Sequence, residues 1–233
     1  MITVYPYESL GRADHGWLKT RYHFSFSDYL NRHRMNFGRL RVINDDKIKA
    51  GSGFDMHRHE NMEIITFVRS GAITHQDTKG NEGRTEAGNV QVMSAGTGIY
   101  HSEFNLENED TTLFQIWIMP KSKGIEPRWE TAQFSNRKAN GSLPLLVSGR
   151  KEDQDDGALY IHQDASISGG LIDKGKQITH PIKHQAYMII SEGEIEILGH
   201  ALKKGDGIEI IDEDSVSFTA LSDAEVILID VPA

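Results

Sequence analysis

Short apolar runs recur along almost the whole chain, and their spacing constrains the fold more than any other feature of the sequence. Many members of these runs are β-branched or aromatic, and glycine, asparagine or aspartate separates one run from the next. Runs of this length bury one face of a strand and are too short for most helices. The runs predicted as strands are 37–43, 63–68, 90–93, 112–119, 159–162, 187–190, 194–198, 208–211, 216–219 and 226–231.

Helical signals are few. Ser27 would cap a short helix over 28–33, and a helical turn is expected near 129–134. Evenly spaced short strands with many glycines predict an all-β fold of antiparallel sandwiches or barrels, in which one face of each strand is buried.

The chain is long enough for two such units, and its halves resemble each other. With 233 residues it can form two domains of about 115 residues. The segment 63–71 can be laid on 185–193, with glycine at the last position of both. We therefore predict a duplicated β-barrel. The stretches 121–142 and 149–157 lack the strand pattern and are predicted to be connections.

Composition narrows the classes of function. Lys and Arg total 25 against 34 Asp and Glu, so the net charge is −9, and this field would repel nucleic-acid phosphates and anionic lipid. No run approaches the roughly 18 apolar residues of a membrane helix, and the first residues lack a signal-peptide pattern. We expect a cytoplasmic protein that binds neither nucleic acid nor membrane. The chain has no cysteine, so nitrogen and oxygen atoms would have to hold any metal.

Two pairs of polar residues carry metal-binding chemistry. His57 and His59 are two residues apart, so their side chains project from the same face of a strand, and His101 and Glu103 do the same. Three imidazoles plus one carboxylate suit Fe(II), Mn(II), Ni(II), Cu(II) or Zn(II), and leave coordination positions open. Either pair alone also occurs on ordinary strand surfaces, so the residues around the two pairs determine how strongly they indicate a metal site.

These surroundings resemble the two motifs of the cupin superfamily, small antiparallel barrels that hold a metal inside the mouth. The first motif is Gly51-(x5)-His57-x-His59-(x3)-Glu63-(x7)-Gly71, and the second is Gly88-(x9)-Gly98-(x2)-His101-(x3)-Asn105. The first is one residue longer than the usual spacing before its last glycine, and the second lacks the usual proline.

Further motifs narrow the resemblance to the pirin family of cupins. They are His15-Gly16-Trp17-Leu18, Phe24-Ser25-Phe26, Leu40-Arg41-Val42-Ile43-Asn44-Asp45-Asp46, Met62-Glu63-Ile64, His75-Gln76-Asp77 and Ser94-Ala95-Gly96-Thr97-Gly98-Ile99-Tyr100-His101-Ser102-Glu103. They cover about residues 10–130, and the remainder resembles the family's degenerate second barrel. The family's His-Pro-His is His57-Arg58-His59 in this chain.

The resemblance implies a bicupin, two jelly-roll barrels in one chain, with an N-terminal metal-binding domain over 1–130 and a C-terminal domain over 131–233. It implies one divalent transition metal held by His57, His59, His101 and Glu103. Fe(II) is the first expectation, and Mn, Ni, Cu and Zn are the alternatives. Generic cupins would use Glu63 as the carboxylate instead, and strand parity alone allows either acid to face inward. We expect Glu103 to be the ligand and Glu63 to support the site.

The remaining candidate residues receive simpler interpretations. His75 stands beside Asp77 in a predicted hairpin and is interpreted as a paired turn or surface histidine. Phe114 and Trp117 are interpreted as core residues.

The second barrel is predicted to lack metal. In the ungapped comparison, His57, His59, His101 and Glu103 fall opposite residues that are not ligands, namely Thr179, Pro181, Phe218 and Ala220. A slip of one or two residues would bring His180 or His184 near the barrel mouth, but neither has a paired second ligand.

Two functions of different classes follow from the resemblance. Pirins are similar to cupin dioxygenases that open flavonols such as quercetin with O2, with release of carbon monoxide. In that hypothesis a flavonol-like aromatic and O2 are the substrates, and Glu103 takes the proton of the flavonol 3-hydroxyl. Pirins of eukaryotes also resemble iron-dependent regulators, which implies a protein partner whose binding depends on the redox state of the metal.

Overall fold

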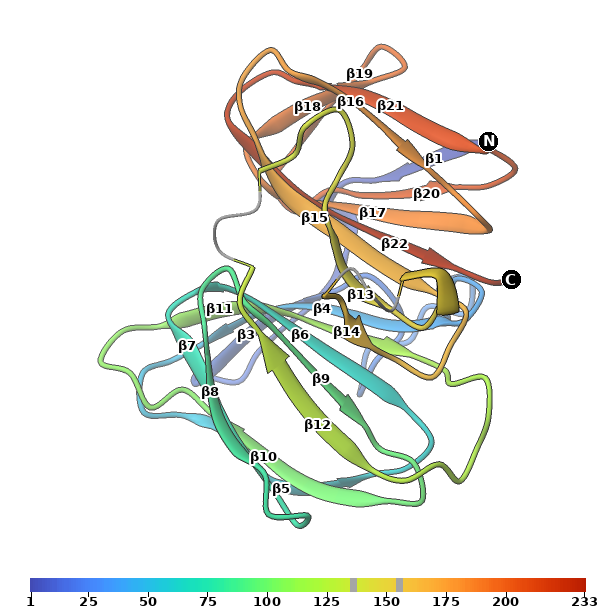
Figure 1. Cartoon of the computed structure of the whole chain (residues 1–233). Helices are drawn as coiled ribbons and strands as arrows, with labels where there is room; N and C mark the ends of the chain where they lie inside the picture. Colours follow the sequence, from blue (N-terminus) through green and yellow to red (C-terminus); the bar gives the residue numbers. More distant parts are fainter. Residues whose placement is uncertain (135–137, 154–156) are drawn as a thin grey trace. The chain divides into compact units, whose positions relative to one another are not determined.

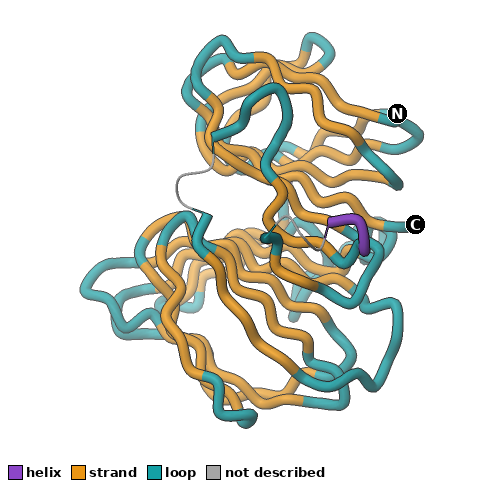
Figure 2. The backbone as a smooth tube through the Cα atoms, in the orientation of Figure 1, coloured by secondary structure: helices purple, strands orange, loops and turns teal. Residues whose placement is uncertain are grey.

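The computed structural model describes residues 1–134, 138–153 and 157–233 of the chain. Strands dominate these residues, and short 3-10 helices occur at η1 (Tyr7–Ser9) and η2 (Lys151–Asp153) (Figures 1 and 2). The chain divides into two compact units. The N-terminal unit contains the described residues of 11–134 together with Leu159–Gln163, and the C-terminal unit contains Met1–Leu10, the described residues of 138–158 and Asp164–Ala233. The predicted all-β fold is confirmed.

The N-terminal unit consists of a large and a small antiparallel sheet. The large sheet has the strand order β12 (Arg128–Ala132), β9 (Val90–Ser94), β6 (Glu63–Ser70), β11 (Thr111–Ile118), β4 (Leu40–Ile48), β3 (Leu18–Tyr22) and β2 (Gly11–Asp14). The small sheet has the order β5 (Gly53–His59), β10 (Ile99–Phe104), β7 (Ala72–Asp77) and β8 (Glu82–Glu86). The short β14 (Leu159–Tyr160) also belongs to this unit.

The C-terminal unit repeats this arrangement. The strands of its large sheet that belong to this unit are, in order, β1 (Ile2–Tyr5), β20 (Gly207–Ile210), β17 (Gln185–Glu192), β22 (Ala224–Val231), β15 (Ser166–Ile172) and β13 (Leu145–Ser148). Its small sheet runs β16 (Gln177–Pro181), β21 (Ser215–Ala220), β18 (Glu194–Ile197) and β19 (His200–Lys203). Because corresponding strands occupy corresponding places in both units, the predicted duplication of a β-barrel is confirmed.

The outermost strand beside β9 and β20 comes from a different part of the chain in each unit. β12 pairs with β9, whereas β1, from the beginning of the chain, pairs with β20 through partners such as Ile2 and Ile210. The observed units therefore differ from the expected split into 1–130 and 131–233, because β1 completes the C-terminal sheet. Residues 159–163 also lie in the N-terminal unit.

Both helical expectations were wrong. Around 28–33 the backbone forms turns, in which Phe26 and Tyr29 exchange backbone hydrogen bonds of 3.0 Å. Ser27 has φ +50°, whereas a residue that caps a helix needs extended backbone. The second segment contains strand β12, since its backbone pairs with β9 and places Trp129 opposite Met93. The predicted connection 121–142 thus includes a strand, and both connections contain residues outside the described ranges.

Side chains on the inner face of the N-terminal large sheet change character along the strands. Leu18, Ile48, Val68 and Leu113 form an apolar cluster toward one end of the barrel. The next inward residues toward the other end include Thr66 and Gln115, which are paired across β6 and β11. Because inward residues recur at every second position, this barrel has an apolar closed end and a polar middle.

The C-terminal barrel has an apolar interior instead. Ile178, Val216, Phe218 and Ala220 belong to one buried cluster. Along β16 the buried residues are Ile178 and His180, and the residues between them are exposed. The ungapped comparison was therefore one residue out of register on this strand, because Thr179 and Pro181 project outward.

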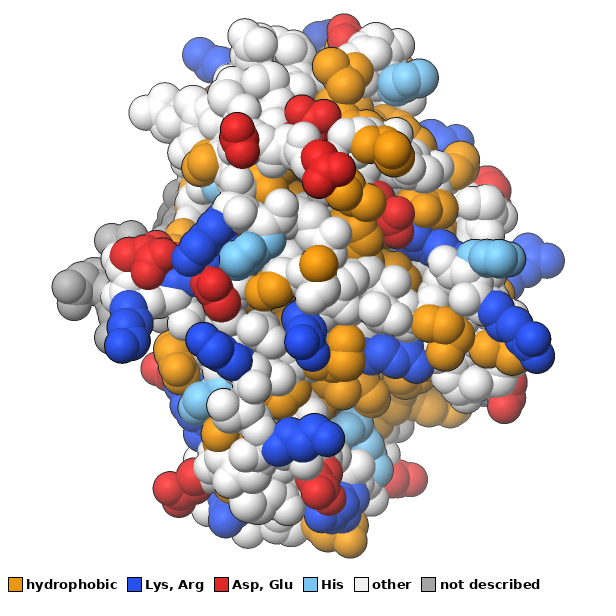
Figure 3. Space-filling model, turned by 90° about the vertical axis from the view of Figure 1, so that its right-hand side faces the viewer, with side chains coloured by type: hydrophobic (Ala, Val, Ile, Leu, Met, Phe, Trp, Pro, Cys, Tyr) orange, Lys and Arg blue, Asp and Glu red, His pale blue; other side chains and the backbone are white. Residues whose placement is uncertain are grey.

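The surface shows no segregation of charge on the face drawn in Figure 3, where acidic and basic side chains are interspersed. The helices found among the described residues are too short to cross a membrane.

Gly53 allows β5 and β10 to approach each other closely. A Cβ added at Gly53 would lie 2.5 Å from the Cα of Phe104 on β10. Gly53→Ala should therefore lower the free energy of unfolding by about 1–3 kcal/mol, the usual cost of overpacking. Urea unfolding of the metal-free protein measures this change. Ser52→Ala adds no atom and serves as the control, and equal stability of Gly53→Ala and wild type would contradict the prediction.

Candidate metal centre

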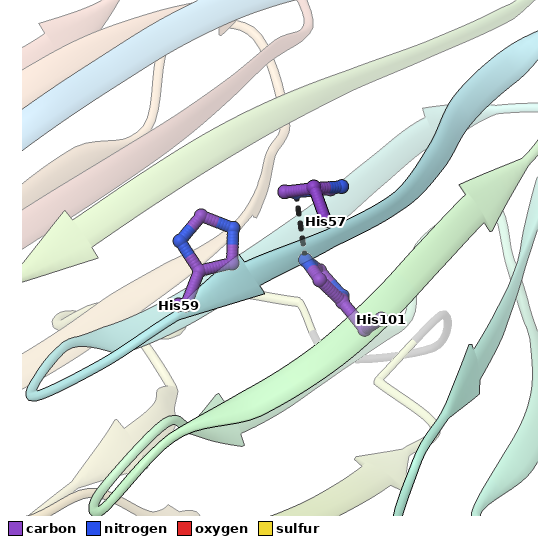
Figure 4. A group of neighbouring side chains, drawn as sticks. All are labelled: His57, His59 and His101. Atoms are coloured by element: carbon purple, nitrogen blue, oxygen red, sulfur yellow. Dashed lines mark hydrogen bonds between the residues drawn. The ribbon is translucent and has the colours of Figure 1, made fainter.

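Three imidazoles meet where strands β5 and β10 pair. His57 and His59 lie on the same face of β5, and His101 lies on β10 directly opposite His57. Figure 4 shows the three rings next to one another, two from one strand and one from its neighbour. One ring nitrogen from each residue falls within 4.8 Å of those of the other two. The structure thus brings together all three histidines predicted from the sequence.

A β-bulge beside His57 turns side chains of β5 toward the interior of the barrel. His57 pairs with His101 and Phe54 pairs with Glu103, so Asp55 and Met56 together face one residue of β10. The extra residue shifts the alternation of side chains, so that Phe54 and His57 both line the interior. Bulges commonly re-aim side chains next to functional sites.

The backbone determines which nitrogen of His57 faces the centre. Nδ1 of His57 lies 2.7 Å from the carbonyl oxygen of Asp55 and must carry the hydrogen, since a carbonyl only accepts. Nε2 of His57 then points toward His101, whose Nε2 is 3.1 Å away.

A chain of buried side chains orients His101 in the same sense. Asp77 accepts a hydrogen bond of 2.9 Å from Nε2 of His75, and Nδ1 of His75 lies 3.4 Å from Nδ1 of His101. Because Nε2 of His75 donates to Asp77, Nδ1 of His75 is left to accept from Nδ1 of His101. Nε2 of His101 is therefore unprotonated. The ring of His75 stacks on Trp129 at an interplanar angle of 10°, and its side chain is fully buried. The interpretation of His75 as a turn or surface residue was wrong.

The imidazoles are held in the form that binds metal. Burial, followed by the neighbouring imidazoles, lowers the pKa of His59 and of His101 to about 3, so both rings are neutral at neutral pH. Nε2 of His57 and Nε2 of His101 face each other at 3.1 Å, a separation that lets one ion contact both. Neutral imidazole nitrogens are preferred ligands of divalent transition metals, and the residues therefore fit such an ion.

Glu103 is fixed by donors from the opposite sheet. Its carboxylate accepts hydrogen bonds from Thr66 at 3.1 Å, from Gln91 at 2.7 Å and from Gln115. The side chain is 3% exposed. Two residues from His101 on β10, it shares the inward face with that ligand candidate. Its assignment as a metal ligand remains a prediction.

Glu63 lies on the other side of the large sheet. Ile64 lines the barrel cavity and Thr66 reaches Glu103, so the alternation along β6 directs Glu63 away from the interior. There its carboxylate accepts hydrogen bonds from Ser94 Oγ at 2.7 Å and from the backbone N–H of His162 at 3.2 Å. Burial raises the pKa of Glu63. The sequence alone allowed either glutamate to face inward. In the structure, the alternation of side chains along β6 turns Glu63 away from the three imidazoles.

A cavity of about 650 Å³ opens beside the imidazoles, within the usual range for small-molecule sites of ~300–1,000 Å³. Its aromatic walls include Phe26 and Trp117, whose rings meet edge to face at 5.4 Å. Trp17 and Phe54 meet similarly at 5.1 Å. Trp117 is therefore a cavity residue rather than a core residue as we interpreted it, whereas Phe114 is fully buried.

The polar lining of this cavity was missed from the sequence. Its residues are Thr20, Asn44, Asp46 and Gln115. The sequence contains a signal for this lining, because polar residues stand at inward positions of otherwise apolar strands. Recognising them requires knowing which face of each strand is inward.

The histidines considered for the second barrel have other partners. Nδ1 of His180 accepts from the backbone N–H of Leu143 at 3.3 Å, and Nε2 of His184 lies 3.1 Å from Asp164. The absence of metal from this barrel remains a prediction.

Comparisons with known proteins agree with this architecture. The family model described as Pirin matches residues 4–118, and the model described as Quercetinase C-terminal cupin domain matches residues 145–231. The chain is 48% identical over 232 residues to a Caulobacter vibrioides protein named pirin-like protein, covering 99% of both chains. It is 42% identical over 235 residues to the quercetin 2,3-dioxygenase of Escherichia coli K12, covering 100% of this chain and 99% of the other.

A solved structure shares the fold over the full length. The crystal structure of the bacterial pirin YhhW from Escherichia coli in complex with nickel(II) superposes with a TM-score of 0.91 at 41% identity. The match covers 100% of this chain and 99% of that one.

Replacing His75 tests whether it orients His101. His75→Phe keeps a ring against Trp129 but removes the nitrogen that accepts from His101, so metal affinity should fall about 10–100-fold. Calorimetric titration of the metal-free protein with Ni(II) measures the affinity. The exposed His200 of the C-terminal unit provides the control, His200→Ala, which should bind as wild type does. Unchanged affinity in His75→Phe would refute the orienting role.

Asp46 should make stability depend on pH. Burial, the largest cause, raises its pKa to about 7, from about 3.9 in an unfolded chain. At pH values between these two pKa values, the folded protein retains a proton on Asp46 that the unfolded chain releases. The stability that Asp46 contributes through this proton is fully present below about pH 4 and is lost as pH rises through 7.

Asp46→Asn removes this dependence. The stability of the variant relative to wild type should rise from pH 5 to pH 8, at most by about 1.4 kcal/mol for each pH unit. Urea unfolding of both metal-free proteins measures the difference. The same difference at both pH values would show that Asp46 is not held protonated by burial.

Proposed function

Because this chain belongs to the pirin family of bicupins, we propose that it is a metal-dependent dioxygenase that cleaves flavonols such as quercetin with O2 and releases carbon monoxide. The observation that carries the proposal is the convergence of three imidazoles at an aromatic-walled cavity of about 650 Å³. The Escherichia coli relative named quercetin 2,3-dioxygenase, similar over the full length, supports the reaction class.

One divalent transition metal would be held by His57, His59 and His101, with Glu103 as the fourth ligand. Fe(II) is our first assignment, and the nickel(II) in the related Escherichia coli structure makes Ni(II) the main alternative. When bound, such an ion would stabilise the anion of the flavonol 3-hydroxyl and bring O2 beside it.

Glu103 is the residue that we assign to the proton of the flavonol 3-hydroxyl. A carboxylate has about four lone-pair positions, and Thr66, Gln91 and Gln115 occupy three of them. The donors hold the side chain in one orientation and leave one position, on Oε2, which the metal and the substrate proton would occupy in turn. The three imidazoles would use their unprotonated nitrogens on the metal, so Glu103 is the proposed ligand that is left to accept a proton.

The aromatic walls would position a flat substrate. Trp117 packs edge to face on His59 with ring centroids 4.8 Å apart, and Phe26 packs on Trp117. Trp17 and Phe54 line the same cavity. Such walls bind the ring system of a flavonol and keep bulk water from the reacting carbons.

Oxygen uptake tests the proposal directly. Protein loaded separately with Fe, Mn, Ni and Cu is mixed with quercetin, and consumption of O2 and release of carbon monoxide are followed. We expect both with at least one metal and neither with metal-free protein. The absence of both with every metal would overturn the dioxygenase proposal and favour a regulatory role.

The two buried glutamates provide a matched pair of variants. Glu103→Gln retains an oxygen ligand but removes the base, so we expect turnover to fall by about 10²–10⁴-fold and by more than metal occupancy falls. Glu63→Gln makes the same chemical change on the opposite face of the large sheet and should leave metal occupancy and turnover near the wild-type values. Both are measured by elemental analysis and oxygen uptake on the same samples. Activity that falls only in proportion to metal would restrict Glu103 to ligation.

A further inference from the structure

The cavity has a second polar wall, on the large sheet. Strands β3, β4 and β11 contribute Thr20, Asn44, Asp46 and Gln115 to its lining. Thr20 pairs with Asp46, and Asn44 pairs with Gln115. Asp46 pairs with Leu113, which belongs to the apolar end of the barrel. Trp117 lies four residues further along β11, opposite Val42 and nearer the imidazoles. The polar wall thus extends the cavity from the metal site toward the closed end of the barrel.

These side chains carry oxygens that the protein does not satisfy. Oδ1 of Asn44 and Oε1 of Gln115 are buried without a hydrogen-bond partner among the described residues, and Oγ1 of Thr20 and Oδ1 of Asp46 have no partner there beyond the contact of these two side chains with each other. Asp46 is 1% exposed and Thr20 is 4% exposed. A buried polar atom left unpaired destabilises the folded protein. Several such atoms in one cavity mark a place where a ligand supplies the missing partners.

The missing partners are hydrogen-bond donors. Asn44, Asp46 and Gln115 present acceptor oxygens, and the Thr20 hydroxyl both donates and accepts. Asp46 faces the hydroxyl of Thr20, and the charges of Asp45, Glu103 and Arg69 act on its carboxyl group. A neutral donor such as a phenolic hydroxyl satisfies acceptors of this kind without bringing a charge into a buried site.

We propose that Asp46, together with Thr20 and Asn44, forms a second subsite that recognises a hydroxyl group remote from the oxygen at the metal, so that the preferred substrates are polyhydroxylated aromatics. This inference rests on the proposed function and specifies its substrate class. A site built to hydrogen-bond a hydroxyl discriminates strongly against an analogue without it, because the buried acceptors then stay unpaired. The aromatic walls supply affinity for the ring system, and the polar wall selects its substituents.

Equilibrium binding of two flavonols tests the subsite. Quercetin carries hydroxyls on both ring systems, whereas 3-hydroxyflavone carries only the hydroxyl proposed to meet the metal. Dissociation constants are measured without O2 on Ni(II)-loaded protein, and KM and kcat are measured separately with O2. We expect wild type to bind quercetin at least about tenfold more tightly than 3-hydroxyflavone, since the buried acceptors stay unpaired when the ligand lacks the remote hydroxyls.

Asp46→Asn should reduce this preference by about tenfold, through KM more than kcat, and change the affinity for 3-hydroxyflavone little. Thr20→Val, which removes a hydroxyl at nearly constant volume, should act in the same direction and provides a second variant if Asp46→Asn folds poorly. Asp45→Asn is the matched control: Asp45 is next in sequence, projects from the other face of β4 and pairs with Arg69. It should retain the wild-type preference.

The outcomes separate the two proposals. If both flavonols are bound and cleaved but wild type does not prefer quercetin, or if Asp46→Asn and Thr20→Val both keep the preference, the subsite is overturned and the dioxygenase stands. If neither flavonol binds or reacts, both proposals fail. A preference that is lost in Asp46→Asn and kept in Asp45→Asn supports the subsite.

Discussion

The antiparallel pairing of β5 with β10 is the interaction on which the site depends. Its register sets His101 opposite His57 and Glu103 opposite Phe54, and the bulge between these pairs turns both His57 and Phe54 inward. A shift of one residue would send every one of these side chains to the other face, because side chains alternate along a strand. Gly53, where a Cβ would meet the backbone of β10, allows the two strands to approach closely enough to keep this register.

Around this pairing, buried polar groups hold the side chains of the proposed ligands in fixed orientations. A carbonyl holds Nδ1 of His57, and the chain from Asp77 through His75 holds Nδ1 of His101. Both rings consequently face the centre with Nε2. The same principle applies to Glu103, which three donors from the large sheet keep in place. Such a network is costly to bury unless all its members are satisfied, and four of the buried atoms without a partner belong to residues that line the cavity, where a ligand can reach them.

The two barrels show how little of the scaffold needs to change to carry a site. Their sheets have matching strand orders, yet the strands corresponding to β5 and β10 are β16 and β21, whose inward residues include Ile178, Val216 and Phe218. An apolar interior packs as a core. In the N-terminal barrel the apolar cluster of Leu18, Ile48, Val68 and Leu113 supports one end, while polar side chains line the cavity beside it.

The sequence by itself determined the all-β class and the duplication, because strand periodicity is a local property, and it indicated the three histidines through the resemblance of their surroundings to the cupin and pirin motifs. It placed strand boundaries less well and mistook the β12 segment for a helical turn, since that strand exists only through its pairing with β9. Tertiary structure alone decided that Glu63 faces away from the imidazoles, that His75 is buried behind His101 and that Asp46 lines the cavity. Each of these depends on which face of a strand is inward and which distant strand lies opposite, and the long-range register that settles both is not encoded in any short segment of the chain.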